Sequence, residues 1–463
     1  MDRKTPIMDA LGTVSGNVKA RFCMPGHKGD TGFFGGGLLR FDITELPGAD
    51  NLLHPDGPIA ESQDLHAQFI EAGAAHYTTG GSTAGILAML ALFRGKKVIF
   101  PRGIHLSAAN AVFMYGITPV YMDVAPCDYP ALVTADQVKD ALQKNKDAVA
   151  VFIVYPNYFG LCCDIEAIAE IVHKAGLPLV VDAAHAAHFV YSPLLPLTPS
   201  HAGADVWVES AHKTLPAMNQ CACLCVSESA HIDTGDLKRA LTTVQTTSPS
   251  YLLLASLDYA HAYMRDKGEM ELFRIISLGK RFKQMLGDIP GIRCPDIRAD
   301  GLADHDPLKI IVDVSGTGHT GMSVRDMLAS KGIHVEAADM KNILLLLSVG
   351  DTAAQLELLH EALARIDKIR GRSIFFSPYS MPAATKYSQN ARFWSNIEKV
   401  RIERATGFVS ACTAGVFPPG EAVIARGQII TFDIAGYLLE ARRQGFDMFG
   451  VDDEYIWVYK ERL

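Results

Sequence analysis

Residues 204–217 read ADVWVESAHKTLPA, an apolar segment followed at once by a polar group that carries a lysine. The run 205–209 has the pattern of a buried strand, and Ser210, His212 and Lys213 come directly after it. Lysine is almost never fully buried unless it is paired, so a lysine in this position is either solvated or reactive. The segments around it decide between these two hypotheses.

Apolar runs alternate with helical patterns on both sides of this stretch, from about residue 75 to residue 230. The predicted strands are 97–101, 118–124, 148–155, 177–182 and 205–209. Several are apolar throughout, as in a parallel sheet that is covered on both faces. Thr134 and Gln137 predict a capping box ahead of one helix, and Gly176 predicts the end of another. We therefore expect an α/β domain whose functional sites lie at the carboxyl ends of the strands.

The chain has 463 residues, which is enough for two or three domains. We predict an N-terminal segment with the large domain over 1–285, a smaller α/β domain over 286–380 and a C-terminal domain over 381–463. A long helix at 252–286 is expected to bridge the first two. Strands at 309–314 and 342–348 with a helix at 323–330 indicate the smaller domain. The residues after the proline-containing stretch 377–382 are expected to form helices and turns.

Composition excludes some classes of partner. The net charge of −8 provides no basic surplus to neutralise phosphates, so we expect no nucleic-acid partner. The N-terminus lacks the apolar core of a signal peptide, and the longest apolar stretch, 84–93, is too short to span a bilayer. We therefore predict a cytoplasmic protein that has no membrane partner.

The nine cysteines do not form a disulfide framework, because their number is odd. Cys221, Cys223 and Cys225 alternate with apolar residues, which puts the three thiols on one face of a strand. Zinc sites favour a CxxC spacing that is absent here. We interpret the three cysteines as small apolar side chains of a buried strand and predict no metal site.

A turn of small residues precedes a helix at residue 84. Gly80, Gly81, Ser82 and Thr83 combine glycines, hydroxyls and a helix N-terminus, an arrangement that favours a bound phosphate. Alone, the pattern is also that of a plain helix cap. The lysine of a P-loop and the GxSxG of a hydrolase are both missing.

Two further polar positions follow predicted strands. Asp182 ends the strand 177–182, where a carboxylate needs a partner and could be a helix cap, a metal ligand or the counter-ion of a buried cation. His185 and His188 stand three residues apart and could share a helical face. Without a third ligand in view, we interpret them as a packing pair and not as a zinc site.

Together these features predict a site for pyridoxal phosphate. This cofactor needs an amine that bonds to its aldehyde, a carboxylate that keeps its ring nitrogen protonated, a phosphate anchor and a group packed on the ring. Lys213, 31 residues after Asp182, supplies the amine, and Asp182 supplies the carboxylate. Ser82 with Thr83 would anchor the phosphate, and His105, which follows the strand 97–101, would pack on the ring. Lys213 is therefore predicted to be reactive.

At these residues the sequence resembles the ornithine/lysine/arginine decarboxylase family of fold type I pyridoxal-phosphate enzymes. The similar motifs are MPGHKG (24–29), LPGAD (46–50), HPDGPI (54–59), the Gly-Ser-Thr turn, Arg102 with His105 and Ser107, DAAH (182–185), SAHKTLPA (210–217), TSPSY (247–251) and PPG (418–420). They run in order over most of the chain. No single motif decides the family, but so many in sequence make chance a poor explanation.

The resemblance implies decarboxylation of an amino acid, in first place a basic one (arginine, lysine or ornithine), to an amine and CO2, as in polyamine biosynthesis. It implies a transferase-like large domain with a mainly parallel sheet and a homodimer, or else a tetramer. The implied catalytic residues are Lys213, His105 and His212, with His212 or Lys213 returning a proton. The implied cofactor-binding residues are Gly81, Ser82, Thr83, His105, Asp182, His185, Ser210, His212, Lys213, Thr247 and Ser248. Of these, Thr247 and Ser248 would reach the phosphate in the neighbouring subunit.

Three departures from the family pattern leave the substrate open. Leu106 stands where a lysine is common, Ala183 where a glutamate is usual, and Glu421 where an apolar residue usually follows PPG. A cationic substrate needs a carboxylate, and Asp50, Asp56 and Glu421 are candidates, each with an alternative interpretation as a surface or turn residue.

Other functions stay open on the sequence alone. They are an aminotransferase, aldolase or lyase on the same fold, or a non-catalytic relative. An aminotransferase usually clamps the substrate carboxylate with an arginine, and no motif singles one out. A dinucleotide-binding oxidoreductase is disfavoured, because the glycine-rich run 32–37 does not lie between a strand and a helix.

Overall fold

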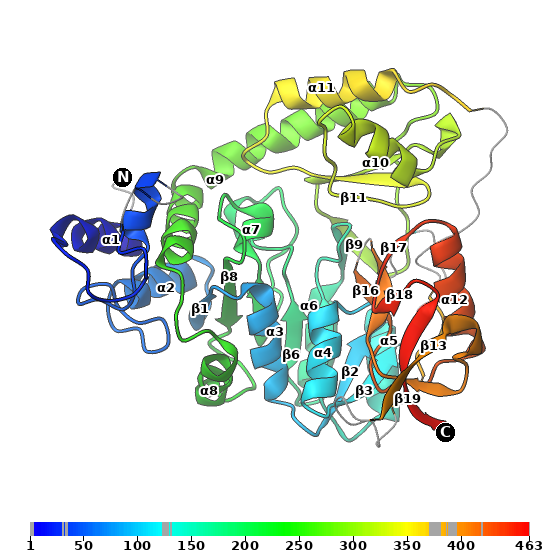
Figure 1. Cartoon of the computed structure of the whole chain (residues 1–463), viewed down its shortest axis with the longest axis horizontal. Helices are drawn as coiled ribbons and strands as arrows, with labels where there is room; N and C mark the ends of the chain where they lie inside the picture. The colour runs from blue at the N-terminus through cyan, green and yellow to red at the C-terminus, as the bar shows by residue number, and fades with distance from the viewer. Residues whose placement is uncertain are drawn as a thin grey trace. The chain divides into compact units, whose positions relative to one another are not determined.

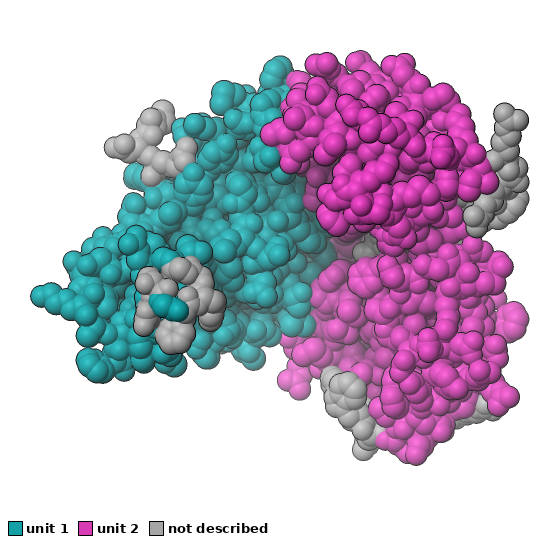
Figure 2. All heavy atoms as spheres, turned by 45° about the horizontal axis from the view of Figure 1, so that its top comes forward, with its two compact units in different colours: residues 1–92, 172–274, 348–350 teal, residues 93–171, 275–347, 351–463 magenta. Residues whose placement is uncertain are grey.

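The computed structural model describes residues 4–29, 32, 36–122, 129, 132–369, 381–385, 387, 396–417 and 420–462. Positions 123–124 of one predicted strand, 377–380, Pro418, Pro419 and residues 33–35 of the glycine-rich run 32–37 lie outside the described residues. The chain divides into two compact units (Figure 2). Unit 1 comprises residues 1–92, 172–274 and 348–350, and unit 2 comprises 93–171, 275–347 and 351–463.

Unit 1 contains four strands side by side (Figure 1). In spatial order they are β1 (Ala74–Thr78), β8 (Ala222–Val226), β7 (Val206–Glu209) and β6 (Leu179–Asp182). β6 and β7 are parallel, whereas β8 is antiparallel to both of its neighbours. β1 therefore runs in the same direction as β6 and β7, and the carboxyl ends of these three strands lie at one edge.

Helices cover both faces of these strands. The helices of unit 1 are α1 (Pro6–Asn17), η1 (Gly36–Phe41), α2 (Pro58–Phe69), α3 (Gly81–Ala91), η2 (Phe189–Tyr191), α7 (Ala211–Thr214), α8 (Thr234–Val244) and the start of α9 (Tyr251–Leu286). α3 approaches closely because it has a glycine at the contact: a Cβ at Gly85 would lie 2.6 Å from Cγ2 of Val208. On the opposite face, the ring of Tyr77 contacts His66 of α2 and His261 of α9.

The structure confirms that the three neighbouring cysteines are buried. Cys223 and Cys225 lie on β8, and Cys221 comes one residue before it. The long helix predicted at 252–286 is confirmed as α9, which begins one residue earlier. The strand β1 was not predicted, since its sequence AAHYT has little apolar character.

One buried carboxylate joins several segments of unit 1. Asp205 accepts hydrogen bonds from the backbone N–H groups of Leu179 and His231, both at 2.7 Å. Its two oxygens also contact Nε2 of His173 at 2.9 Å and Nδ1 of His231 at 2.8 Å. The carboxylate thus holds together the starts of β6 and β7 and the segment before α8.

Replacing Asp205 with alanine is expected to lower the free energy of unfolding by about 3 kcal/mol, because two backbone donors would lose their acceptor. Urea denaturation measures the change. Asp147→Ala is the control: it removes an exposed carboxylate that pairs with Lys97 at the surface, and we expect little effect. Equal midpoints for the two variants would contradict the structural role of Asp205.

Unit 2 contains three parallel strands in the order β4 (Ala148–Val154), β2 (Lys97–Pro101) and β3 (Thr118–Met122). Helices α4 (Leu106–Met114), α5 (Ala135–Lys144) and α6 (Ile165–Lys174, which extends into unit 1) lie between the strands in sequence. The capping box of Thr134 and Gln137 is confirmed at the start of α5. The alternation of parallel strands with helices agrees with the predicted α/β class.

A second group of elements in unit 2 contains the strands predicted at 309–314 and 342–348 and the helix predicted at 323–330. Its antiparallel sheet has the order β10 (Lys309–Asp313), β12 (Asn342–Leu346) and β11 (Ala337–Ala338). Helices α10 (Gly321–Ala329) and α11 (Ala353–Ala364) accompany it, with η3 (Ser315–Thr317) between β10 and α10. The short strands β5 (Leu161–Cys163) and β9 (Leu302–His305) pair with each other.

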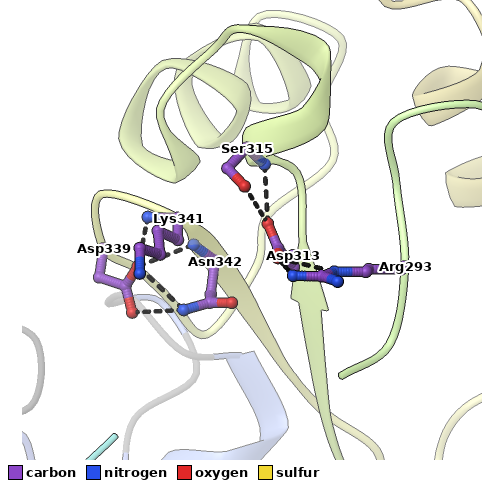
Figure 3. Close-up of polar contacts among 6 residues, drawn as sticks. All are labelled: Arg293, Asp313, Ser315, Asp339, Lys341 and Asn342. Atoms are coloured by element: carbon purple, nitrogen blue, oxygen red, sulfur yellow. Dashed lines mark hydrogen bonds and ion pairs between the residues drawn. The ribbon is translucent and has the colours of Figure 1, made fainter. Parts of the chain in front are cut away.

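Two aspartates fix the ends of these strands (Figure 3). Arg293 donates two hydrogen bonds to Oδ2 of Asp313, at 3.0 and 2.9 Å, and Oδ1 of Asp313 accepts from the N–H and hydroxyl of Ser315. Asp339 accepts from the N–H groups of Lys341 and Asn342, both at 2.7 Å. These polar side chains therefore stabilise the turns at the strand ends.

The prediction of helices and turns after residue 382 is wrong. The structure has strands β13 (Ile397–Arg401), β14 (Phe408–Ser410), β15 (Ala414–Phe417), β16 (Glu421–Ile424), β17 (Asp447–Phe449), β18 (Val451–Asp452) and β19 (Tyr455–Arg462), with one longer helix, α12 (Phe432–Arg443), and the short η4 (Ile402–Arg404). Most of these strands are two to five residues long. Such runs are too short to show the alternation that marks a strand. Among the described helices, none has the length and apolar character needed to cross a membrane.

Candidate active site

The carboxyl edge of the strands in unit 1 gathers several of the predicted site residues. Asp182 ends β6, Ser210 follows β7, and α7 carries His212 and Lys213. The backbone ties the two strand ends together, since the N–H of Ala183 donates to Val208 at 3.0 Å and that of Ser210 donates to Ala184 at 3.3 Å. The common strand direction thus brings together residues that are 31 positions apart.

Lys213 meets a histidine at this edge. Its Nζ lies 3.2 Å from Nε2 of His185, and His185 is buried. The idea that His185 and His188 share a helical face is wrong, because both belong to consecutive turns after β6. His188 is instead fully buried against the ring of Phe189, with ring centroids 4.8 Å apart. His185 therefore contacts Lys213 at the strand edge, whereas His188 packs in the core.

Asp182 is buried where β6 ends. It is 4% exposed, and its Oδ1 accepts a hydrogen bond from the N–H of Ala184 at 3.2 Å. Ala183, one of the departures from the family pattern, is completely buried between the two. A carboxylate in such a position is costly unless a cation or a donor faces it.

α3 presents its N-terminus at the same edge, because it follows β1. Gly81 has a positive φ of 69°, which favours glycine, and its N–H donates to Gln220 in the loop after α7. No side chain caps the helix: Gly80 holds the N-cap position. The first turn, with the partly exposed Ser82 and the exposed Thr83, therefore has backbone donors and a positive dipole end available to an anion.

Three buried hydroxyl groups at this edge have no hydrogen-bond partner among the described residues. They belong to Thr79, Ser210 and Thr214. Buried hydroxyls are normally paired, so three orphans around one strand edge indicate a place for a polar ligand. Thr79 and Thr214 were missed by the sequence prediction, because a threonine beside a strand end carries no signal of its own.

The imidazole of His212 is fixed by the backbone. Its Nδ1 lies 2.9 Å from the carbonyl oxygen of Cys221, so Nδ1 carries the proton and donates it. Burial lowers the pKa of His212, and the charge of Lys213 lowers it further, while the bond to Cys221 acts in the opposite direction. His212 is therefore neutral at pH 7, with its Nε2 lone pair unprotonated.

Unit 2 holds the remaining predicted histidine. His105 is the exposed N-cap of α4, and its Nδ1 accepts a hydrogen bond from the N–H of Ser107 at 3.2 Å. A β-bridge pairs His105 with Glu421, the residue that departs from the family pattern. The carboxylate of Glu421 lies against Gly103, where a Cβ would collide with it. The backbone at His105 thus pairs with Glu421, and the absence of a side chain at Gly103 leaves room for the Glu421 carboxylate.

Three other predicted residues lie on loops. Thr247 and Ser248 are exposed on the segment between α8 and α9. Asp50 caps a turn: its carboxylate accepts from the N–H groups of Asp56, Gly57 and Ile59 at 3.0, 2.9 and 2.8 Å. Burial raises the pKa of Asp50, but backbone hydrogen bonds from Asp56, Asn51, Gly57 and Ala60 together lower it more, so the net shift of the pKa is downward. The structure favours the turn interpretation for Asp50.

Comparisons with known proteins agree with this fold. A family described as "Orn/Lys/Arg decarboxylase, major domain" matches residues 5–298. An arginine decarboxylase of Bacillus anthracis is 31% identical over 97% of this chain and 95% of its own length. The constitutive lysine decarboxylase of Escherichia coli is 24% identical to this chain. That alignment covers 74% of this chain and 58% of the lysine decarboxylase.

Solved structures show the same architecture. The structure of the Escherichia coli constitutive lysine decarboxylase superposes with a TM-score of 0.81, covering 99% of this chain and 82% of that chain at 19% identity. The predicted α/β class of fold type I is therefore confirmed over the whole chain. The family match covers more than half of the sequence, and the arginine decarboxylase of Bacillus anthracis aligns with nearly all of it. The chain belongs to the Orn/Lys/Arg decarboxylase family and is an amino-acid decarboxylase.

Proposed function

We propose that the chain decarboxylates arginine, with pyridoxal phosphate bound at Lys213. The observation that carries the proposal is the strand edge of unit 1, where an amine, a buried carboxylate and an uncapped helix N-terminus come together. Arginine is favoured over lysine because identity is higher, over more of the chain, to the arginine decarboxylase than to the lysine decarboxylase.

The residues at this edge fit the cofactor. A phosphate needs hydrogen-bond donors, and the first turn of α3 and the orphaned hydroxyls of Thr79, Ser210 and Thr214 offer them. Asp182 offers the anion that a protonated ring nitrogen requires. Lys213 offers the amine, so each part of the cofactor has a counterpart in the chain.

Bound pyridoxal phosphate supplies an aldehyde for the amino groups and a ring that accepts the electrons released as CO2 leaves. Lys213 would hold the aldehyde of the cofactor through its amine, and Nε2 of His185 lies 3.2 Å from that Nζ. Asp182, held by the N–H of Ala184, stabilises positive charge where the electrons are accepted. Neutral His212 keeps its Nε2 for a proton transfer, and His105 is proposed to pack on the ring.

We further propose a homodimer, with a tetramer as the alternative assembly. Thr247 and Ser248 are exposed and thus open to a second copy of the chain, as the predicted contact with the partner's phosphate requires. Sedimentation of the holoenzyme measures the assembly. A monomer with full activity would contradict this part of the proposal.

Glu421 is proposed to recognise the cationic end of the substrate, and its pKa makes the hypothesis testable. Burial raises the pKa of Glu421 to about 8, although the charge of Arg102 acts against the increase. Only the ionised carboxylate pairs with a guanidinium, so recognition should strengthen as pH rises toward 8 and level off above it.

Glu421→Gln is therefore expected to lower kcat/KM for arginine about 10- to 100-fold above pH 8, since a charged hydrogen bond is lost, and less at lower pH. The ratio of wild-type to variant kcat/KM across the pH range is the measurement. Asp140→Asn, a change at an exposed carboxylate of α5, is the control. A ratio that does not change with pH would exclude this role.

The substrate assignment is tested by CO2 release from the holoenzyme with arginine, lysine, ornithine and neutral amino acids. We expect the highest kcat/KM with arginine. If lysine or ornithine were turned over fastest, only the assignment of the substrate would change. Formation of a keto acid without CO2 would contradict the proposed reaction.

A further inference from the structure

The face of the unit 1 strands opposite α3 bears a layer of buried polar side chains. Residues that alternate along a strand point to the same side, so Cys223 and Cys225 of β8 share this face. Their partners in register are Tyr77 and Glu209 for Cys223, and Trp207 for Cys225. All five side chains are buried.

α2 and α9 cover this layer with two histidines. The rings of His66 and His261 lie 3.6 Å apart between centroids and 32° from parallel, and both residues are buried. The ring of His66 also lies 6.4 Å from that of Tyr77. His66 thus faces the strand that pairs with β8.

Three metal-binding atoms meet here. A ring nitrogen of His66 and the sulfur atoms of Cys223 and Cys225 all lie within 4.8 Å of one another, and the two sulfur atoms are 3.5 Å apart. Two thiolates on one tetrahedral zinc ion are about 3.8 Å apart, given zinc–sulfur bonds of about 2.3 Å. The spacing therefore suits a shared ion with only small movements.

Unpaired atoms in the layer point to a missing ligand. Neither ring nitrogen of His66 has a hydrogen-bond partner among the described residues, although the residue is 0% exposed. The same is true of Oε2 of Glu209. By contrast, Asp258 in this layer is fully bonded, to Ser62 and to the start of α1. Buried polar atoms without a partner are rare, so this group requires a water or an ion.

We propose that His66, Cys223 and Cys225 bind one zinc ion. On binding, the two S–H bonds break, two S–Zn bonds form, and two protons leave to solvent. Zn²⁺ with two thiolates is electrically neutral, whereas Cu(I) with two thiolates leaves a negative charge that a buried site would not compensate. The fourth position of the tetrahedron is left to a water molecule, because Glu209 lies opposite Cys223 in register but outside the cluster of three ligand atoms.

The other cluster of this kind among the described residues does not carry the same inference. His173, Asp205 and His231 also bring three ligand atoms within 4.8 Å, but the ring nitrogens of both histidines already bond to the Asp205 carboxylate, and His231 is exposed. A buried zinc site at His66 would instead act structurally, by tying α2 to β8.

Metal analysis of the chain, grown with zinc and purified without chelators, tests the proposal. We expect about one zinc per wild-type chain. Cys225→Ser and His66→Gln should lose most of it, and Cys221→Ser, whose thiol already donates to Leu253 at 3.2 Å, should retain it. Cobalt substitution provides a second readout, because thiolate charge-transfer absorbance should appear in the wild type and vanish in Cys225→Ser.

Wild-type protein without zinc, both as purified and after reduced reconstitution, overturns the proposal even if the variants fail to fold. Zinc that survives Cys225→Ser but disappears in His231→Asn overturns it too, by placing the ion at the exposed cluster. Because metal content is measured without substrate, this result is independent of the proposed decarboxylation.

Discussion

Replacing Lys213 with alanine is expected to abolish CO2 release and the visible absorbance of the protein-bound cofactor. The physical reason is that no other group would hold the aldehyde covalently at the strand edge beside Asp182. Loss of a covalent catalytic group in other enzymes costs up to about 10⁶-fold in kcat, and we expect a loss of at least about 10⁴-fold here. Stopped-flow absorbance and CO2 release measure the two effects.

Two controls separate chemistry from folding. Lys213→Arg keeps the positive charge next to His185 but cannot form the covalent link, so it should be as inactive as the alanine variant. Lys139→Ala removes an exposed lysine from α5 and should leave activity unchanged. Substantial activity in Lys213→Arg would show that the amine serves only as a charge.

Asp182→Asn is expected to lower kcat by about 10²–10³-fold, of the order seen when one electrostatic partner of a reacting group is removed. Asparagine has nearly the same shape and keeps the oxygen that accepts from Ala184, so the fold should persist. What it loses is the negative charge. The prediction is therefore a loss of activity without a matching loss of stability.

Turnover measures the predicted loss of activity, and thermal unfolding of the same preparation measures whether the stability is unchanged. Asp182→Glu, which keeps the charge but moves it by one methylene, should recover part of the activity. If Asp182→Asn retained wild-type turnover, the carboxylate would be a turn residue and not the anionic partner of the cofactor.

Much of the region around the site could be predicted from the sequence, because its signals are local. An apolar run such as 205–209 marks a buried strand, and the polar residues after it fall at the strand end in almost any parallel arrangement. Lys213, Asp182 and the glycine-rich start of α3 each come soon after a strand in the sequence. Because these strands run in the same direction, the three features lie at the same edge.

Features that depend on register could not be predicted. The contact of His185 with Lys213 arises because a backbone hydrogen bond joins the turn after β6 to the start of α7, whereas the sequence suggested that His185 could lie on a helix. The orphaned hydroxyl of Thr79 becomes visible only when its surroundings are known. The cysteines on β8 were correctly placed in a buried strand, but nothing local indicated that His66, more than 150 residues earlier, faces them.

The prediction missed the C-terminal strands for a different reason. Strands of two to five residues carry too few alternations, and several, such as β13 with the sequence IEKVR, are only partly buried. β13 and β14 are stabilised by pairing with β19, and β15 by pairing with β17, which are contacts between segments distant in sequence. Sequence periodicity does not report such pairing.

The central claim is that the amine of Lys213 holds pyridoxal phosphate. Borohydride reduction of the holoenzyme fixes a cofactor–lysine bond, and peptide mapping by mass spectrometry then locates it. The account predicts a single modified peptide, carrying the added mass at Lys213. Modification at another lysine, or at none in a protein that releases CO2 from arginine, would contradict it.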